Sequence, residues 1–223
     1  MPEHAPSSIE TFADRLRAVR DGLPADLALR LHRGVSWTRR AQFEPDDPDV
    51  RFILLWIAFN AVYAQEIDPD APTSERDQFA GYFARISEND RDGCIYDLIW
   101  TRFPHEVRLL LANQFVYAPF WAHHNGRPSF ADWAERLAKS QRAINAALAK
   151  RDTPLVLSIL FDRLYTLRNQ LVHGGATWSS QVNRDQVRDG AAILGELVPL
   201  FLVVMLDAAD AQWGKAYYPV VQA

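Results

Sequence analysis

Three residues in the C-terminal third of the chain have side chains suited to acid–base chemistry beside a phosphate. Residues 164–175 read LYTLRNQLVHGG, which places Arg168, Asn169 and His173 within six positions. An imidazole exchanges a proton near neutral pH, and a guanidinium binds phosphate through paired hydrogen bonds. The spacing alone is a weak signal, because a chain with this many arginines and histidines gives about half a match by chance.

A helix is expected to position these residues. Residues Thr153-Pro154 are typical of a helix start, and Gly174-Gly175 of a helix end. Leucines recur at helical spacing between them, at positions 157, 160, 164, 167 and 171. On such a helix Arg168 and His173 lie about 140° apart, while Asn169 and His173 share a face. Arg168 must therefore reach around the helix, or the last turn must unwind at the glycines. The plainer alternative is that His173 only compensates the helix dipole.

The segment LRNQLVHGG, residues 167–175, resembles the hallmark of the HEPN superfamily, in which Arg and a polar residue precede His near a helix end. Residues 51–64, RFILLWIAFNAVYA, are similar to an earlier core helix of some members. The resemblance implies an all-α fold, a single-domain helical bundle of HEPN type over residues 1–223 with extra helices inserted in the middle. Its core helices are expected at about 48–66, 154–173 and 183–211.

The resemblance further implies a metal-independent endoribonuclease that needs no cofactor. The ribose 2′-hydroxyl attacks the neighbouring phosphate, leaving a 2′,3′-cyclic phosphate and a 5′-hydroxyl. His173 is expected to act as general base or general acid, and Arg168 to hold the scissile phosphate. Asn169 is expected to orient His173 or to hydrogen-bond the phosphate.

One copy of this motif supplies only one imidazole and one guanidinium. The resemblance implies that two protomers pair so that both motifs face one cleft, a homodimer with a composite active site. Domains of this kind often act as toxins of toxin–antitoxin systems or in antiviral defence, so an antitoxin or a regulatory protein is an expected partner. Two alternatives stay open: a non-catalytic HEPN module that binds RNA, nucleotide or a partner protein, and a helical adaptor unrelated to nucleic acid.

Composition limits these functions. The net charge of −4 argues against a protein that coats duplex nucleic acid with a large basic face, but a small basic site is compatible with it. Cys94 is the single cysteine, which excludes an internal disulfide and a multi-cysteine zinc site. The apolar stretches 52–64 and 191–209 are too short or too interrupted for a transmembrane helix. We expect a cytoplasmic protein without a membrane partner.

The other elements are predicted from caps and breakers. Ser7 and Glu10 have capping-box spacing for a helix that ends at Gly22, and a second helix follows from about Pro24 through Arg40. Asp47-Pro48 is typical of a helix start. Residues 67–73 are predicted to form a loop, and residues 74–113 two or three helices broken near 89–93 and at Pro104. A charged helix is expected from 129–132 to about 150.

Residues 115–128 are expected to be irregular, and two features in them have alternative interpretations. The adjacent His123 and His124 suggest a metal site only weakly, since no partner cluster has metal-ligand spacing. The aromatic residues at 115, 117, 120 and 121 can stack on unpaired bases or can pack in a core or a dimer interface. Packing is the favoured interpretation.

Overall fold

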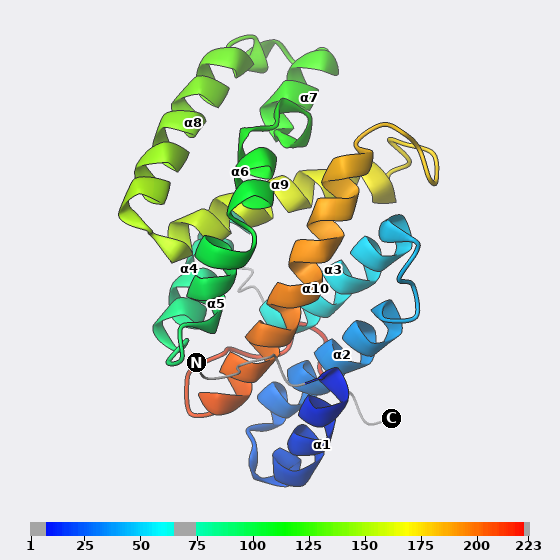
Figure 1. Ribbon diagram of the computed structural model, residues 1–223, viewed down its shortest axis with the longest axis vertical. Helices are drawn as coiled ribbons and strands as arrows, with labels where there is room; N and C mark the ends of the chain where they lie inside the picture. The colour runs from blue at the N-terminus through cyan, green and yellow to red at the C-terminus, as the bar shows by residue number, and fades with distance from the viewer. Residues whose placement is uncertain (1–7, 65–74, 221–223) are drawn as a thin grey trace.

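The structure, a computed structural model, describes residues 8–64 and 75–220. Within these ranges the chain is all-helical, with ten α-helices and no β-strand, which confirms the predicted fold class (Figure 1). The helices are α1 Ile9–Val19, α2 Ala25–Ala41, α3 Pro48–Tyr63, α4 Glu75–Glu88, α5 Cys94–Asp97, α6 Pro104–Ala112, α7 Ala118–His124, α8 Trp133–Lys150, α9 Thr153–Val172 and α10 Arg184–Asp207. Five helices, α4 to α8, lie between α3 and α9 in the chain.

The three predicted core helices are α3, α9 and α10. The Asp47 side chain caps α3 by accepting the Val50 N–H at 3.0 Å, and Asp152 caps α9 in the same way. Helix α3 was expected to continue to residue 66, but Tyr63 is its last residue; residues 65 and 66 lie outside the described part. Helix α10 ends at Asp207, not near 211, because the chain turns there and the buried Trp213 indole donates to the Ala208 carbonyl.

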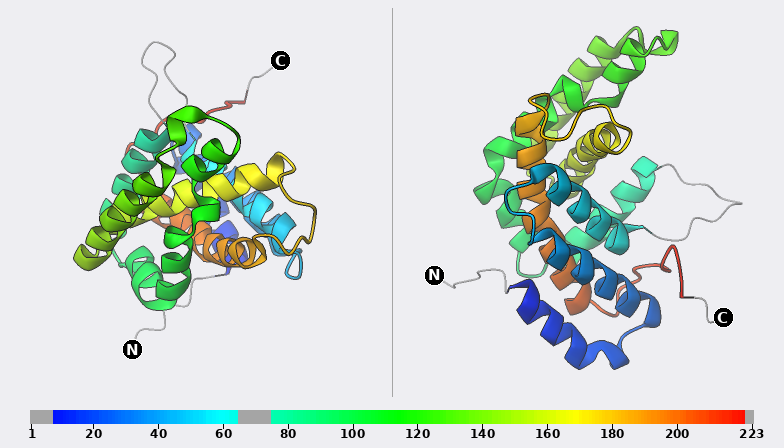
Figure 2. Two further views of the ribbon diagram at one scale, coloured as in Figure 1. Left: turned by 90° about the horizontal axis from the view of Figure 1, so that it is seen from above. Right: turned by 90° about the vertical axis from the view of Figure 1, so that its right-hand side faces the viewer.

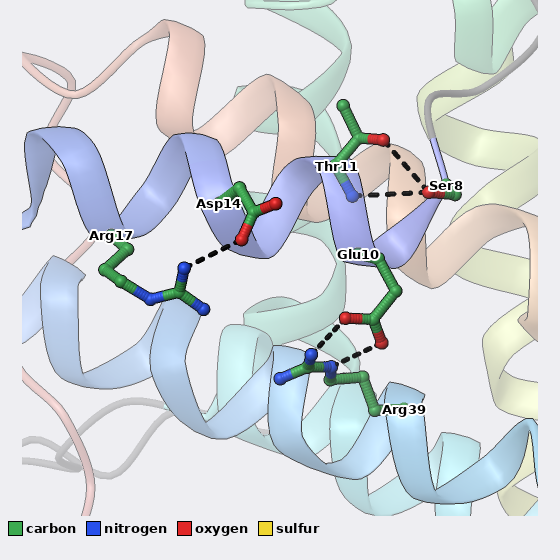
Figure 3. Close-up of polar contacts among 6 residues, drawn as sticks. All are labelled: Ser8, Glu10, Thr11, Asp14, Arg17 and Arg39. Atoms are coloured by element: carbon green, nitrogen blue, oxygen red, sulfur yellow. Dashed lines mark hydrogen bonds and ion pairs between the residues drawn. The ribbon is translucent and has the colours of Figure 1, made fainter.

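The first helix is capped by a different serine from the predicted one. The hydroxyl of Ser8 accepts the Thr11 N–H at 3.2 Å, while Ser7 lies outside the described residues (Figure 3). Glu10 closes no capping box on Ser8. Its carboxylate instead binds the guanidinium of Arg39 on α2, a bidentate pairing that ties the two helices together. Glu10 thus contributes a cross-helix ion pair alongside the local cap that Ser8 gives to α1.

Aromatic rings from four helices form the centre of the core. Phe59 of α3 lies 4.3 Å, between ring centroids, from Phe161 of α9, which lies 4.7 Å from Phe83 of α4. Phe201 of α10 closes the cluster. Helix α10 is long and apolar enough to cross a membrane, but 61% of its apolar window is buried inside the bundle. Its apolar character is therefore accounted for by packing on α2, α3 and α9.

Helices α6, α7 and α8, residues 104–151, form a lobe. Its α7 and the start of α8 project beyond the rest of the bundle, while α6 and the end of α8 pack on the main core (Figures 1 and 2). Part of this lobe was expected to be irregular, yet residues 118–124 form helix α7. A small separate core explains this, since Tyr117 and Phe120 are buried against Leu137 of α8. Contacts between residues distant in the sequence thus stabilise a helix in a segment where prolines and a glycine predicted none.

Candidate functional site

The last turn of α9 carries the three predicted site residues. Arg168 and Asn169 are half-buried, whereas His173 is exposed directly after the helix ends. The Nη1 of Arg168 donates to Oδ1 of Asn169 at 2.9 Å. The backbone N–H of His173 donates to the Asn169 carbonyl, and its imidazole makes no hydrogen bond or ion pair with any described residue. The site thus joins Arg168 to Asn169 but leaves the imidazole unengaged.

Two glycines end α9 directly after His173. Gly174 has φ +70°, and its N–H donates to the Leu171 carbonyl at 3.3 Å. The N–H of Gly175 donates to the Gln170 carbonyl at 2.7 Å, completing a Schellman motif. A Cβ on Gly175 would lie only 3.0 Å from that carbonyl oxygen. Both glycines are therefore required by the backbone, and His173 sits at the point where the helix stops.

The regular geometry of α9 determines how Arg168 and His173 are arranged within one chain. Helix α9 stays regular through Val172, so the last turn does not unwind ahead of His173. Positions 168 and 173 therefore lie on well-separated sides of the helix, as the sequence predicts. Within one protomer Arg168 thus lies apart from the imidazole, whereas Asn169, four residues before His173, shares its face of the helix.

Gln170 holds this turn in place, and sequence reasoning missed it. Its Nε2 donates to the Phe115 carbonyl at 2.6 Å, and its Oε1 accepts from Nδ2 of Asn183 at 2.7 Å. The side chain thereby connects the end of α9 to the lobe and to the start of α10. The sequence signals this role only by placing an amide side chain inside the motif. The partners of Gln170, Phe115 and Asn183, lie 55 and 13 residues away in the sequence.

The loop that follows the motif is fixed to the start of α3. The Trp178 indole donates to Asp47 at 2.8 Å, and the Ser179 N–H donates to Asp49 at 3.2 Å. Arg184 binds both carboxylate oxygens of the buried Asp49 at 2.6 Å. Burial acts to raise the pKa of Asp47, but hydrogen bonds from the Val50 N–H and the Trp178 indole outweigh it and leave this pKa below its usual value.

The surface around the motif is apolar. Val172 is 49% exposed, and Trp178 and Val182 of the loop are exposed further. Helix α3 lies beside α9, with 6.1 Å between the ring centroids of Trp56 and Tyr165. Its outward side carries apolar residues that are only partly covered in one chain, namely Val50, Ile53, Leu54, Ile57 and Ala61. Partly exposed apolar side chains of this kind are suited to an interface.

The other residues with reactive or metal-binding side chains form no comparable site in the described part of the chain. Over residues 8–64 and 75–220, no group of three or more His, Cys, Asp or Glu is arranged to hold a metal ion. His124 Nδ1 lies 2.8 Å from the Phe120 carbonyl within α7. Burial raises the pKa of the Cys94 thiol, so it is a poor nucleophile at neutral pH. The acidic residues 66, 68 and 70, read as a loop, lie outside the described part.

Comparison with known proteins gives no relative for this chain. No protein-family model, curated protein or solved structure matches it. The HEPN resemblance, the dimer and the site assignments therefore stay predictions that rest on the motif and its geometry.

Proposed function

We propose that the chain is a metal-independent endoribonuclease of HEPN type, with its active site at the C-terminal end of α9. The observation that carries this proposal is that the two functional side chains differ in burial and in hydrogen bonding. Arg168 is half-buried and held by Asn169, whereas the His173 imidazole is exposed and has no partner among the described residues. A fixed guanidinium suits phosphate binding, and an unengaged imidazole suits proton transfer.

The proposed reaction is a transesterification within the RNA. An imidazole accepts the proton of the ribose 2′-hydroxyl while the 2′ oxygen forms a bond to the adjacent phosphorus. The bond from phosphorus to the 5′ oxygen breaks, and an imidazolium gives that oxygen a proton. Arg168 stabilises the added negative charge on the phosphoryl oxygens. The need for a 2′-hydroxyl explains selectivity for RNA without a metal.

Two imidazoles are needed if acid and base act together, so the proposed active form is a homodimer with a composite site. The apolar surface around the motif supports this, because a two-fold interface that covers Val172 and the outer side of α3 brings two copies of the motif together. Each protomer then supplies one imidazole and one Arg–Asn pair. Within one chain, Arg168 and His173 lie on different sides of α9. In a dimer, the Arg168 of one protomer can lie close to the imidazole of the other.

A matched pair of surface variants tests the dimer. Val172→Glu places a charge beside the motif, and Val19→Glu places the same charge on α1, where the valine is 43% exposed. We expect Val172→Glu to be a folded monomer without RNase activity, and Val19→Glu to stay dimeric and active, by analytical ultracentrifugation and RNA cleavage. Full activity of monomeric Val172→Glu would contradict the composite site.

The proposed biological setting is a cytoplasmic toxin or antiviral-defence effector, controlled by an antitoxin or another regulatory protein. This part rests on the resemblance of residues 167–175 to the HEPN motif. The second candidate function is a non-catalytic module that binds RNA, nucleotide or a protein at the same place. It is favoured by the imidazole itself, which no described residue orients. Co-purification of a partner bound to the end of α9, with no cleavage in its absence or presence, would favour this module.

A further inference from the structure

The lobe formed by α6 to α8 has a net charge opposite in sign to that of the rest of the chain. Residues 104–151 contain seven arginines and lysines against three acidic residues, a net charge of +4. Because the whole chain carries −4, the other residues carry −8. An RNA strand is therefore repelled by most of the molecule and attracted by this lobe.

Most of these cations have no anionic partner among the described residues. Arg136 pairs with Asp132, and Arg151 donates to the Tyr96 hydroxyl. The side chains of the remaining five form no ion pair or hydrogen bond with any described residue: Arg108, Arg127, Lys139, Arg142 and Lys150. All five are exposed. Exposed like charges repel one another, so an external polyanion is the natural counterpart of this set.

A groove in the lobe offers a place for such a ligand. A cavity of about 540 Å³ lies between α6 and α8, with Arg108, Gln141 and Asn145 as its polar lining. The remaining wall is apolar and consists of Ala112, Ile144, Leu148 and Ala149. The Gln141 Nε2 already donates to the Ala112 carbonyl at 3.4 Å, across the groove. This leaves the Arg108 guanidinium for phosphate, the Asn145 amide for a base edge and an apolar wall for a base or ribose, which match a nucleotide unit.

The groove is connected to the end of α9. Ala112 borders the groove, and three residues later the Phe115 carbonyl accepts the hydrogen bond from Gln170. The Phe115 ring is 43% exposed, which leaves a face for base stacking. Arg163 of α9 donates to Ser140, next to the groove residue Gln141, and His173 lies ten residues further, about 15 Å along the helix. A few nucleotides can span this distance.

We propose that the groove between α6 and α8, with Arg108 in its wall and Arg142 beside its α8 side, binds the backbone of single-stranded RNA and leads the strand to the end of α9. This proposal rests on the proposed ribonuclease function, because it assigns the lobe to the same substrate. It gives the helices inserted between α3 and α9 a role in binding substrate (Figures 1 and 2). Binding through phosphates makes the affinity steeply dependent on salt.

The test compares two variants with the same change in net charge. Arg108→Ala/Arg142→Ala removes the cation in the groove wall and the exposed one beside it, and Arg20→Ala/Arg91→Ala removes two exposed cations elsewhere. Both are made in a His173→Ala background, and binding of a 2′-O-methyl RNA 12-mer is followed by fluorescence anisotropy across salt concentrations. We expect the lobe variant to weaken binding about 10-fold and to lower the salt slope by about 1.4, and the control to change Kd less than 2-fold.

Several outcomes would overturn the proposal: equal effects of the two variants, no RNA binding at low salt, or equal binding of a polyglutamate 12-mer. The two proposals fail separately. A chain that binds RNA through the lobe but never cleaves it keeps this inference and loses the ribonuclease function. A chain that cleaves RNA with the same KM in both variants, tested with His173 intact, keeps the function and loses this inference.

Discussion

Arg163 and Arg168 belong to the same helix but have opposite surroundings. Arg163 is 1% exposed, donates to Ser140 at 3.0 Å and lies 4.4 Å from the ring centroid of Tyr117. Arg168 is half-buried and binds its neighbour Asn169. In the middle of α9 the guanidinium is used to hold the lobe to the bundle. At the end of α9 most of its N–H donors are uncommitted to described residues and face a surface where a ligand can reach them.

The largest expected difference concerns stability. Arg163→Ala leaves a cavity between α8 and α9 and removes the contacts to Ser140 and Tyr117, so we expect the free energy of unfolding to fall by about 2–4 kcal/mol. For Arg168→Ala we expect less than about 1 kcal/mol, since its hydrogen bond is to the next residue in the sequence, Asn169. Urea denaturation of both variants measures the two losses of unfolding free energy. Equal losses would show that Arg163 and Arg168 contribute equally to stability.

Substitution of the glycine that ends α9 should lower the stability of the protein. Gly174→Ala forces a Cβ into a left-handed backbone conformation, φ +70°, and we expect it to cost about 1–2 kcal/mol of unfolding free energy. Gly22 is the control, because a Cβ there meets nothing within 4 Å and its φ is not positive. Thermal unfolding should find Gly22→Ala neutral or slightly stabilised. The same loss in both variants would mean that the Schellman motif does not fix this turn.

The loop after the motif should loosen in acid. The pKa of Asp47 is lowered in the folded state, so its contribution is present above about pH 4 and is lost as pH falls through the lowered value. Asp47→Ala should cost about 1 kcal/mol at pH 7 through the lost helix cap. This cost should shrink at pH 3, measured by chemical denaturation. A constant cost for Asp47→Ala would contradict this assignment.

The smallest expected effect on stability is at His173. Its imidazole contacts no described residue through a hydrogen bond or an ion pair, so His173→Ala should change the free energy of unfolding by less than about 0.5 kcal/mol. The unfolding curves of the two proteins should overlap. A loss above 1 kcal/mol would point to a structural role, such as compensation of the helix dipole.

The comparison within α9 also separates what the sequence predicted from what it did not. Local signals, such as Asp47-Pro48, Thr153-Pro154 and the glycines after His173, predicted the starts of α3 and α9 and the end of α9 correctly. The separation of Arg168 from His173 followed from helical geometry alone. These features depend on neighbours a few residues away.

Features that depend on distant partners were missed. The role of Gln170 requires Phe115 and Asn183, and helix α7 requires the packing of Tyr117 and Phe120 on Leu137. The pairing of Glu10 with Arg39 on another helix has the same origin. Local spacing carries no information on these contacts, because the three-dimensional fold creates them.

A cleavage assay in EDTA shows whether the end of α9 is a ribonuclease site. Wild type, His173→Ala and Arg168→Ala are incubated with mixed cellular RNA, and the product ends are identified. We predict cleavage by the wild type alone, with 2′,3′-cyclic phosphate ends and a loss of about 10³-fold or more in His173→Ala. Activity that survives both substitutions, or its absence in the folded wild-type dimer, would contradict the account.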